Sequence, residues 1–352
     1  MTTAYRARAP QDAAVQAAWD YLCREANGTG IPGAAFAEDT EFTRPFGGQE
    51  ARARIRVGTG LDIGLDLDDE AFSAMVALAH LPLPLPGRAA CLKDAMLQQV
   101  RRCRWRSRYR FFPAVPEFAA DTDCTAVALS ALHRHHALDG PAACDQAREL
   151  LSAAAPATET HLHPGAVMVY WDDGAEPHAA ARGRKQDAVV SANVLHTVYL
   201  TGLHRTPRGE DLAAATRGHV EDHLRSGRHE KGTRYYPSPA AFLHAASRAC
   251  TAAPAASARL VRRLRQACRE LGSPDDPLDL ALLTIAATNL GLPEGQHERR
   301  ERLAALQRAD GAWPARPYFR MGRVPVYFGS AHLTTVFALR ALQPCANEDI
   351  PR

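Results

Sequence analysis

Apolar helical segments alternate with amphipathic, Arg-rich segments along most of this chain. Helices that are apolar on most faces are buried, whereas one-sided helices lie at a surface. Six segments of the buried type and six of the one-sided type predict an all-α fold, an (α/α)6 double-layered barrel, or toroid. The buried type comprises residues 67–81, 121–134, 187–203, 238–250, 275–291 and 329–342. The one-sided type comprises residues 10–26, 89–103, 141–154, 208–226, 257–272 and 295–309.

A barrel of this kind uses the whole chain, so we expect a single domain over residues 1–352. Residues 1–60 fit the pattern least and are interpreted as an N-terminal arm. An open superhelix of helical hairpins has the same periodicity, and the repeat alone does not separate it from a closed ring. Residues 104–111 alternate arginine with bulky side chains, which favours a short hairpin arm.

Composition narrows the class of protein. A net charge of +3 is too small to indicate nucleic acid as a partner. The eight cysteines include no CxxC pair, so we expect reduced thiols and a cytoplasmic location. The N-terminus has no apolar signal-peptide core, and no 18-residue apolar window predicts a transmembrane segment. Residues 81–87, LPLPLPG, are either an extended connection or a lip for peripheral membrane contact.

Aromatic residues gather just before the buried segments. If those helices run parallel, the residues that precede them line one cavity at a common mouth. Aromatic faces suit an apolar chain and stabilise a cation beside them. Ordinary core packing is the alternative for each residue taken alone. We expect the wall to include Phe112, Phe118, Tyr170, Trp171, Tyr235, Tyr236, Tyr327 and Phe328.

The stretch DTDCTA, residues 121–126, opens the second buried segment at the same mouth. One interpretation is a helix cap, because Asp121 is a good N-cap and acids stabilise the first turn. The other is a carboxylic acid that burial keeps protonated while nearby donors oppose the rise in its pKa. In that interpretation Asp123, with Asp121 and Cys124 beside it, protonates an alkene or epoxide.

DTDCTA resembles the general-acid motif of class II terpene cyclases. Squalene–hopene cyclases carry Asp-x-Asp-Asp-Thr-Ala and oxidosqualene cyclases carry Asp-Cys-Thr-Ala. The resemblance implies that Asp123 is the proton donor, Cys124 its hydrogen-bond partner and Asp121 a helper carboxylate. A second stretch, with Gln307, Gly311 and Trp313, is similar to the QW motif that ties outer helices together in those enzymes.

The resemblance implies an isomerase of isoprenoid biosynthesis that cyclises a linear isoprenoid. The second barrel of triterpene cyclases is absent, which favours a shorter, C15–C20 substrate, either a diphosphate or a prenylated aromatic. No DDxxD motif is present for ionisation by diphosphate loss. We expect no cofactor, except Mg²⁺ if the substrate is a diphosphate, in which case FAEDTEF (36–42) resembles an acidic stretch that assists the metal.

Two other functions stay open. The first is a zinc-dependent protein, because the predicted toroid also resembles that of protein prenyltransferases, which hold zinc with an Asp-x-Cys pair and a histidine. His332 is the candidate for the histidine. The preceding buried segment, where the Asp-x-Cys pair is expected, has no cysteine. The second alternative function is that of a non-catalytic toroid that binds an apolar ligand. Residues 101–110, with six arginines, are a solvated basic face, a diphosphate headgroup site or a nucleic-acid contact.

Overall fold

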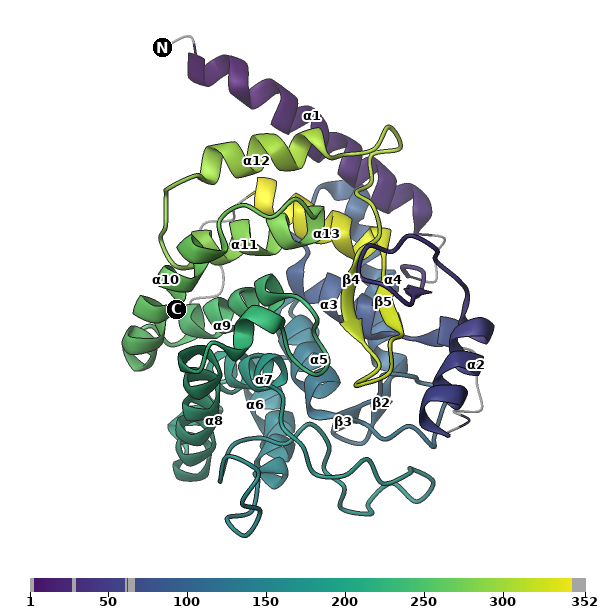
Figure 1. Ribbon diagram of the computed structural model, residues 1–352, viewed down its shortest axis with the longest axis vertical. Coiled ribbons are helices and arrows are strands. Elements are labelled where there is room, and N and C mark those ends of the chain that lie inside the picture. The colour runs from purple at the N-terminus through teal and green to yellow at the C-terminus, as the bar shows by residue number, and fades with distance from the viewer. Residues whose placement is uncertain (1–2, 27–29, 61, 63–66, 344–352) are drawn as a thin grey trace.

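Six inner helices form a closed ring in the computed structural model, which describes residues 3–26, 30–60, 62 and 67–343 (Figure 1). Each inner helix packs on the next, and the last packs back on the first. The ring is therefore a closed barrel rather than an open superhelix, as the predicted (α/α)6 toroid requires. Its helices are α3 (Phe72–His80), α5 (Thr122–Arg134), α7 (Ala188–Leu200), α9 (Pro239–Ala252), α11 (Pro277–Asn289) and α13 (Ala331–Leu342).

Outer helices surround this ring, as Figure 1 shows for α8, α10 and α12. The outer layer comprises α1 (Thr3–Glu25), α4 (Ala90–Arg102), α6 (Gly140–Ala147), α8 (Pro207–Arg225), α10 (Ala258–Leu271) and α12 (Gln296–Ala305). Short 3-10 helices lie between them at Leu67–Asp69, Gly87–Ala89, Arg148–Ala153, Leu203–Arg205, Arg228–Lys231 and Ala255–Ser257. All twelve segments expected from the sequence thus correspond to helices.

Polar side chains cap the N-termini of five inner helices, and these ends meet at one mouth of the barrel. Each cap accepts a hydrogen bond from a backbone N–H of the first turn, which satisfies donors that have no partner inside the helix. The caps are Asp121, Asp187, Ser238, Asp276 and Ser330. The same mouth therefore collects carboxylates, and their chemistry depends on what surrounds each one.

Two small sheets lie beside the helices. Strands β1 (Ala35–Ala37), β5 (Tyr327–Gly329) and β4 (Pro317–Arg320) form an antiparallel sheet in that order. Strands β2 (Arg104–Trp105) and β3 (Arg108–Tyr109) form the hairpin expected at 104–111. The first sheet was not predicted, because strands this short show no clear alternation of apolar and polar residues. Helix α2 (Gly48–Thr59) was not predicted either.

Residues of the QW-like stretch join α12 to α1 and α13. The Gln307 amide donates to the carbonyl oxygens of Ala14 and Gly311, each at 2.8 Å. Trp313 is fully buried, and its indole N–H donates to the carbonyl of Leu303. Gly311 has φ +91°, and a Cβ there would lie 2.3 Å from a backbone oxygen of α1. The N-terminal helix is therefore part of the barrel rather than a separate arm.

Replacing Gln307 with alanine should lower the free energy of unfolding by about 1–3 kcal/mol, because two backbone carbonyls lose their donor. Chemical denaturation measures the loss. Gln266→Ala is the control, since the Gln266 amide bonds only to exposed Glu270 on its own helix. Equal stability of the two variants would contradict a tie between α1 and α12.

The segment LPLPLPG connects α3 to the 3-10 helix before α4, and Leu81 and Pro82 within it are buried. Among the described residues, no helix combines the length and apolar character needed to cross a membrane.

Candidate functional site

The DTDCTA motif is fixed in place by its own polar side chains. Asp121 caps α5, and its Oδ1 accepts the N–H of Cys124 at 2.7 Å. Thr122 donates through Oγ1 to the carbonyl of Met168 at 2.8 Å, while Thr125 Oγ1 accepts a backbone N–H from β3 at 2.9 Å. The cap interpretation is therefore confirmed for Asp121.

Asp123 is not the cap and lies in the first turn of α5, with 7% of its surface exposed. Asn193 of α7 donates through Nδ2 to its Oδ1 at 2.8 Å, and the Tyr236 hydroxyl donates to its Oδ2. The thiol of Cys124 is hydrogen-bonded to Asp121. The Cys124–Asp123 pairing implied by the resemblance is therefore wrong, because the thiol lies on the side of the cap.

Asn193 was missed by the sequence analysis, although a signal for it was present. It is a buried polar residue in an otherwise apolar segment, with 4% of its surface exposed. Buried amides need hydrogen-bond partners, so a polar position in such a helix points to a polar group opposite. Here that group is the carboxyl of Asp123.

A tight turn before α9 positions Tyr236. Its backbone N–H donates to Thr233 Oγ1 at 3.1 Å, and its carbonyl accepts the N–H of Thr233 at 2.6 Å. Asp187, the cap of α7, also accepts the N–H of Tyr235 at 3.2 Å. Gly232 has φ +67°, and a Cβ there would lie 2.4 Å from a backbone oxygen, so the turn requires glycine. The capping network of α7 thus holds the tyrosine against Asp123.

Burial raises the pKa of Asp123 to about 7, and the neighbouring carboxyl of Asp121 adds to the rise. The hydrogen bonds from Tyr236 and Asn193 oppose it. Burial also raises the pKa of Asp121 to about 6, against the donors of Cys124. A large share of Asp123 is therefore protonated at neutral pH, while its two donors stabilise the carboxylate that remains after proton transfer.

The raised pKa of Asp123 predicts how stability depends on pH. The folded pKa of about 7 exceeds the ordinary 3.8, so folding favours the protonated form. The contribution of Asp123 is full below pH 3.8 and is lost as pH rises to about 7. Denaturation of the wild type and Asp123→Asn across this range should show a pH-dependent difference on the order of a few kcal/mol. A difference independent of pH would contradict a buried, titrating Asp123.

A cavity of about 60 Å³ lies beside this carboxyl, with both aspartates and Cys124 in its wall. Five of the eight aromatic residues expected in the wall line it, namely Phe118, Tyr170, Tyr235, Tyr236 and Phe328. Phe111 and Phe319, two further aromatic residues that precede buried segments, line it as well. Phe72, Val169, Val190, Arg320 and Met321 complete the wall and were not predicted. The wall is thus largely aromatic and apolar around the two carboxyl groups, with Arg320 also in it.

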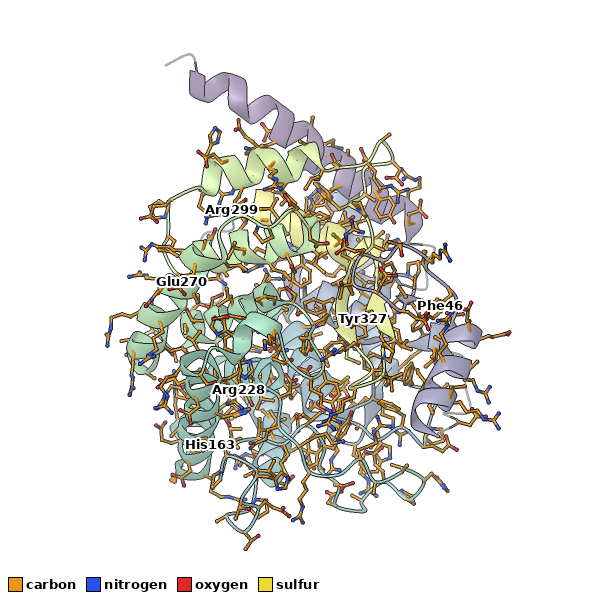
Figure 2. The ribbon with its side chains drawn as sticks, in the orientation of Figure 1. Phe46, His163, Arg228, Glu270, Arg299 and Tyr327 are labelled. Atoms are coloured by element: carbon orange, nitrogen blue, oxygen red, sulfur yellow. The ribbon has the colours of Figure 1, made fainter. Side chains whose placement is uncertain are left out.

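Phe112, Trp171 and Tyr327 were wrongly placed in this wall. Neighbouring residues of a strand point to opposite sides, so only one of Tyr327 and Phe328 on β5 faces inward. Phe112 packs behind Phe118, with ring centroids 5.0 Å apart. The indole of Trp171 donates to the Glu149 carbonyl at 3.2 Å, away from the cavity. Tyr327, labelled in Figure 2, is half-buried on β5, whereas its neighbour Phe328 turns inward.

The Arg-rich stretch is neutralised within the protein where it is buried. Arg108 is in ion pairs with Glu149 at 2.7 Å and Asp173 at 2.5 Å. Arg110 pairs with Glu176 at 2.9 Å. These arginines brace the β2–β3 hairpin against the loops beside it, so they are not open to a headgroup or to nucleic acid.

The residues that the sequence offered as metal ligands, among them His332 and Asp39, do not come together in one site. The ring of His332 packs on Tyr21, with centroids 5.0 Å apart. Asp39, in the acidic stretch 36–42, accepts hydrogen bonds from Thr43. Within the described part of the chain, no group of three or more histidines, cysteines or acids is placed to hold a metal ion.

Solved structures resemble this barrel over nearly its full length. A protein from Actinoplanes aligns at TM-score 0.64 with 18% identity, covering 95% of this chain and 98% of that one. The type II terpene cyclase MstE from Scytonema aligns at TM-score 0.60 with 15% identity, covering 95% and 97%. The chain shares the fold of MstE. An aspartate-to-asparagine variant of MstE, in complex with its substrate geranylgeranyl dihydroxybenzoate, aligns at TM-score 0.61 with 13% identity, covering 96% and 97%.

The same fold carries other chemistry. The GH76 alpha-mannanase of Bacteroides thetaiotaomicron aligns at TM-score 0.52 with 10% identity, covering 95% of this chain and 94% of that one. No protein-family model and no curated protein matches the sequence. The likeness to MstE and the mannanase therefore establishes the barrel, and function has to be argued from the site.

Proposed function

We propose that this protein is a class II terpene cyclase, which starts cyclisation of a linear isoprenoid by protonating it with Asp123. One observation carries the proposal: a buried carboxyl with a pKa raised to about 7 faces a cavity with a largely aromatic wall. In a non-catalytic toroid that only binds an apolar ligand, Asp123 would have no role beyond capping its own helix. Asp121 fills that role, and Asp123 is held by donors from two other elements.

The reaction begins when the Asp123 proton passes to a terminal alkene. The π electrons form the new C–H bond, a carbocation remains on the substrate, and Asp123 becomes a carboxylate. Tyr236 and Asn193 stabilise that carboxylate through charge-assisted hydrogen bonds. The internal alkenes then attack the cation to close rings, and loss of a proton or addition of water ends the cascade.

The cavity wall favours this sequence of steps. The faces of Phe118, Tyr170 and Phe328 stabilise positive charge and exclude water that would quench it early. Asp121 stays bound to its cap and assists through its effect on Asp123. A C15–C20 chain, free or attached to an aromatic headgroup, is the substrate class that we propose, and MstE, which has the same fold, binds a substrate of the second kind.

Cyclisation in deuterium oxide tests the proposal. The protein is incubated with linear isoprenoids of both kinds, and the products are analysed by mass spectrometry and NMR. A cyclic product should carry one deuterium at the carbon of the protonated alkene, because exchangeable Asp123 supplies that hydrogen. A cyclic product without carbon-bound deuterium, or release of diphosphate coupled to ring closure, would overturn initiation by alkene protonation.

A further inference from the structure

A second hollow of about 270 Å³ adjoins the acid cavity, and we call it the basic vestibule. Four cationic side chains line it: Arg182, Lys185, Arg234 and Arg323. Tyr235 and Met321 belong to both walls, so these two residues separate the vestibule from the cavity of Asp123. A ligand that passes between them would contact the acid at one end and the cations at the other.

The four cations lack carboxylate partners within the described part of the chain, although neighbouring Arg184 pairs with Glu159 at 2.5 Å. Among the residues that the structure describes, the wall of the vestibule contains no acidic side chain. Two carboxyl groups outside its wall act on these cations without an ion pair: Asp172 acts on Lys185, and Asp121 acts on Arg182. The oxygens of Asp172 accept backbone N–H groups of the 182–183 turn. Uncompensated positive charge of this density is the arrangement expected of an anion site.

Two further observations indicate that the protein itself does not satisfy the positive charge of the vestibule. Arg234 Nε is buried without a hydrogen-bond partner among the described residues. The pKa of Lys185 is lowered by burial and then by Arg234 and Arg182, with Arg323 adding to the effect. These side chains therefore repel one another, and a bound anion would relieve that repulsion.

Resting on the proposed function, we infer that the basic vestibule binds an anionic headgroup of the isoprenoid directly through these four side chains. The chain of the substrate then enters between Tyr235 and Met321, with its far alkene at Asp123. The acid cavity alone is smaller than the roughly 300–1,000 Å³ of typical ligand sites, so a long chain must extend into the vestibule.

Electrostatics favours an anionic substrate over a neutral one. The Arg182 guanidinium lies 4.3 Å from the ring centroid of Phe118 and 5.3 Å from that of Tyr170, both in the cavity wall. Unneutralised cations this close would disfavour a carbocation in the cavity. A carboxylate or diphosphate in the vestibule cancels their charge, so that the aromatic wall can stabilise the cation.

Binding of headgroup fragments tests the inference without any turnover. Inorganic pyrophosphate and benzoate are titrated separately into the wild-type protein by calorimetry, in EDTA. At least one anion should bind, more weakly as salt is added, because screening weakens exposed charge interactions. Pyrophosphate binding would identify a diphosphate headgroup, and benzoate binding a carboxylate. Binding of neither, or binding only with added Mg²⁺, would overturn direct recognition.

Variants locate the site. The double variant Arg234→Gln/Arg323→Gln should lose at least about tenfold in affinity, because charge-assisted hydrogen bonds are lost. Arg323→Gln alone changes an exposed side chain and serves if the double variant fails to fold. Arg262→Gln, on exposed α10, should bind like the wild type. Equal affinity of wild type and Arg323→Gln would contradict the assignment.

The two proposals fail separately. Asp123→Asn should bind the fragments as the wild type does, since Asp123 is outside the vestibule. If anions bind but no deuterated cyclic product forms, the anion site in the vestibule is supported and the cyclase function is contradicted. If a deuterated cyclic product forms but no anion binds, the cyclase function is supported and the anion site in the vestibule is contradicted.

Discussion

Asp123→Asn should abolish cyclisation, lowering kcat by at least about a thousandfold. A general acid contributes about 10²–10⁴ in rate, and here the acid starts the reaction. Asp121, the other carboxyl in the wall, is engaged as the cap of α5 and does not replace the lost donor. The amide is nearly the same size and keeps hydrogen-bonding capacity toward Asn193 and Tyr236. Product formation is measured with any isoprenoid that the wild type cyclises.

A matched control separates chemistry from folding. Asp279 lies in the first turn of α11 at the same end of the barrel, and burial raises its pKa to about 6. It bonds to Ser238 and does not line the acid cavity. Asp279→Asn should therefore retain activity. An Asp123→Asn variant that keeps kcat within tenfold of the wild type would exclude Asp123 as the proton donor.

Tyr236→Phe should lower kcat by about tenfold to a hundredfold, which corresponds to the 1.5–3 kcal/mol of a hydrogen bond to a charged group. The Tyr236 hydroxyl stabilises the Asp123 carboxylate and lowers the pKa of that carboxyl. Without it the pKa of Asp123 rises further, because burial and Asp121 act unopposed by this donor. The acid becomes weaker, so proton transfer slows.

The pH dependence of kcat distinguishes this role from simple packing. Activity needs protonated Asp123, so the wild-type rate should fall as pH rises through about 7. In Tyr236→Phe the fall should move to higher pH. Tyr199→Phe, which removes a hydroxyl bonded to Arg217 on α8, should leave it in place. If the pH at which kcat falls is unchanged or lower in Tyr236→Phe, the Tyr236 hydroxyl does not lower the pKa of Asp123.

The helical part of the fold was predictable because each inner helix has its own local signal. The segment 275–291 is apolar all round and begins at a capping aspartate, and it becomes α11 with Asp276 as its cap. Closure of the ring had no such signal, since it depends on α13 packing against α3. The same holds for β1, whose Ala35 pairs with Gly329 from the opposite end of the chain.

The candidate site was predictable only in part for a related reason. DTDCTA identified both carboxyls, because a cap and a buried acid are encoded within six neighbouring residues. The donors to Asp123 come from α7 and from the turn before α9. Tyr236 was expected in the wall, but not as a hydrogen-bond donor. Nor did the sequence show which cations stay unpaired, since Arg108 is neutralised by Asp173 and Arg234 lies in the vestibule.

The pKa of the Asp123 carboxyl itself is the most direct test of this account. Carboxyl-¹³C-labelled aspartate is incorporated, and the resonance missing from Asp123→Asn is assigned to Asp123 and followed against pH. The Asp123 resonance should titrate with a midpoint near 7, since a buried acid must keep its proton at neutral pH to donate it. A midpoint near the ordinary 3.8 would show a carboxylate there at neutral pH and contradict the central claim.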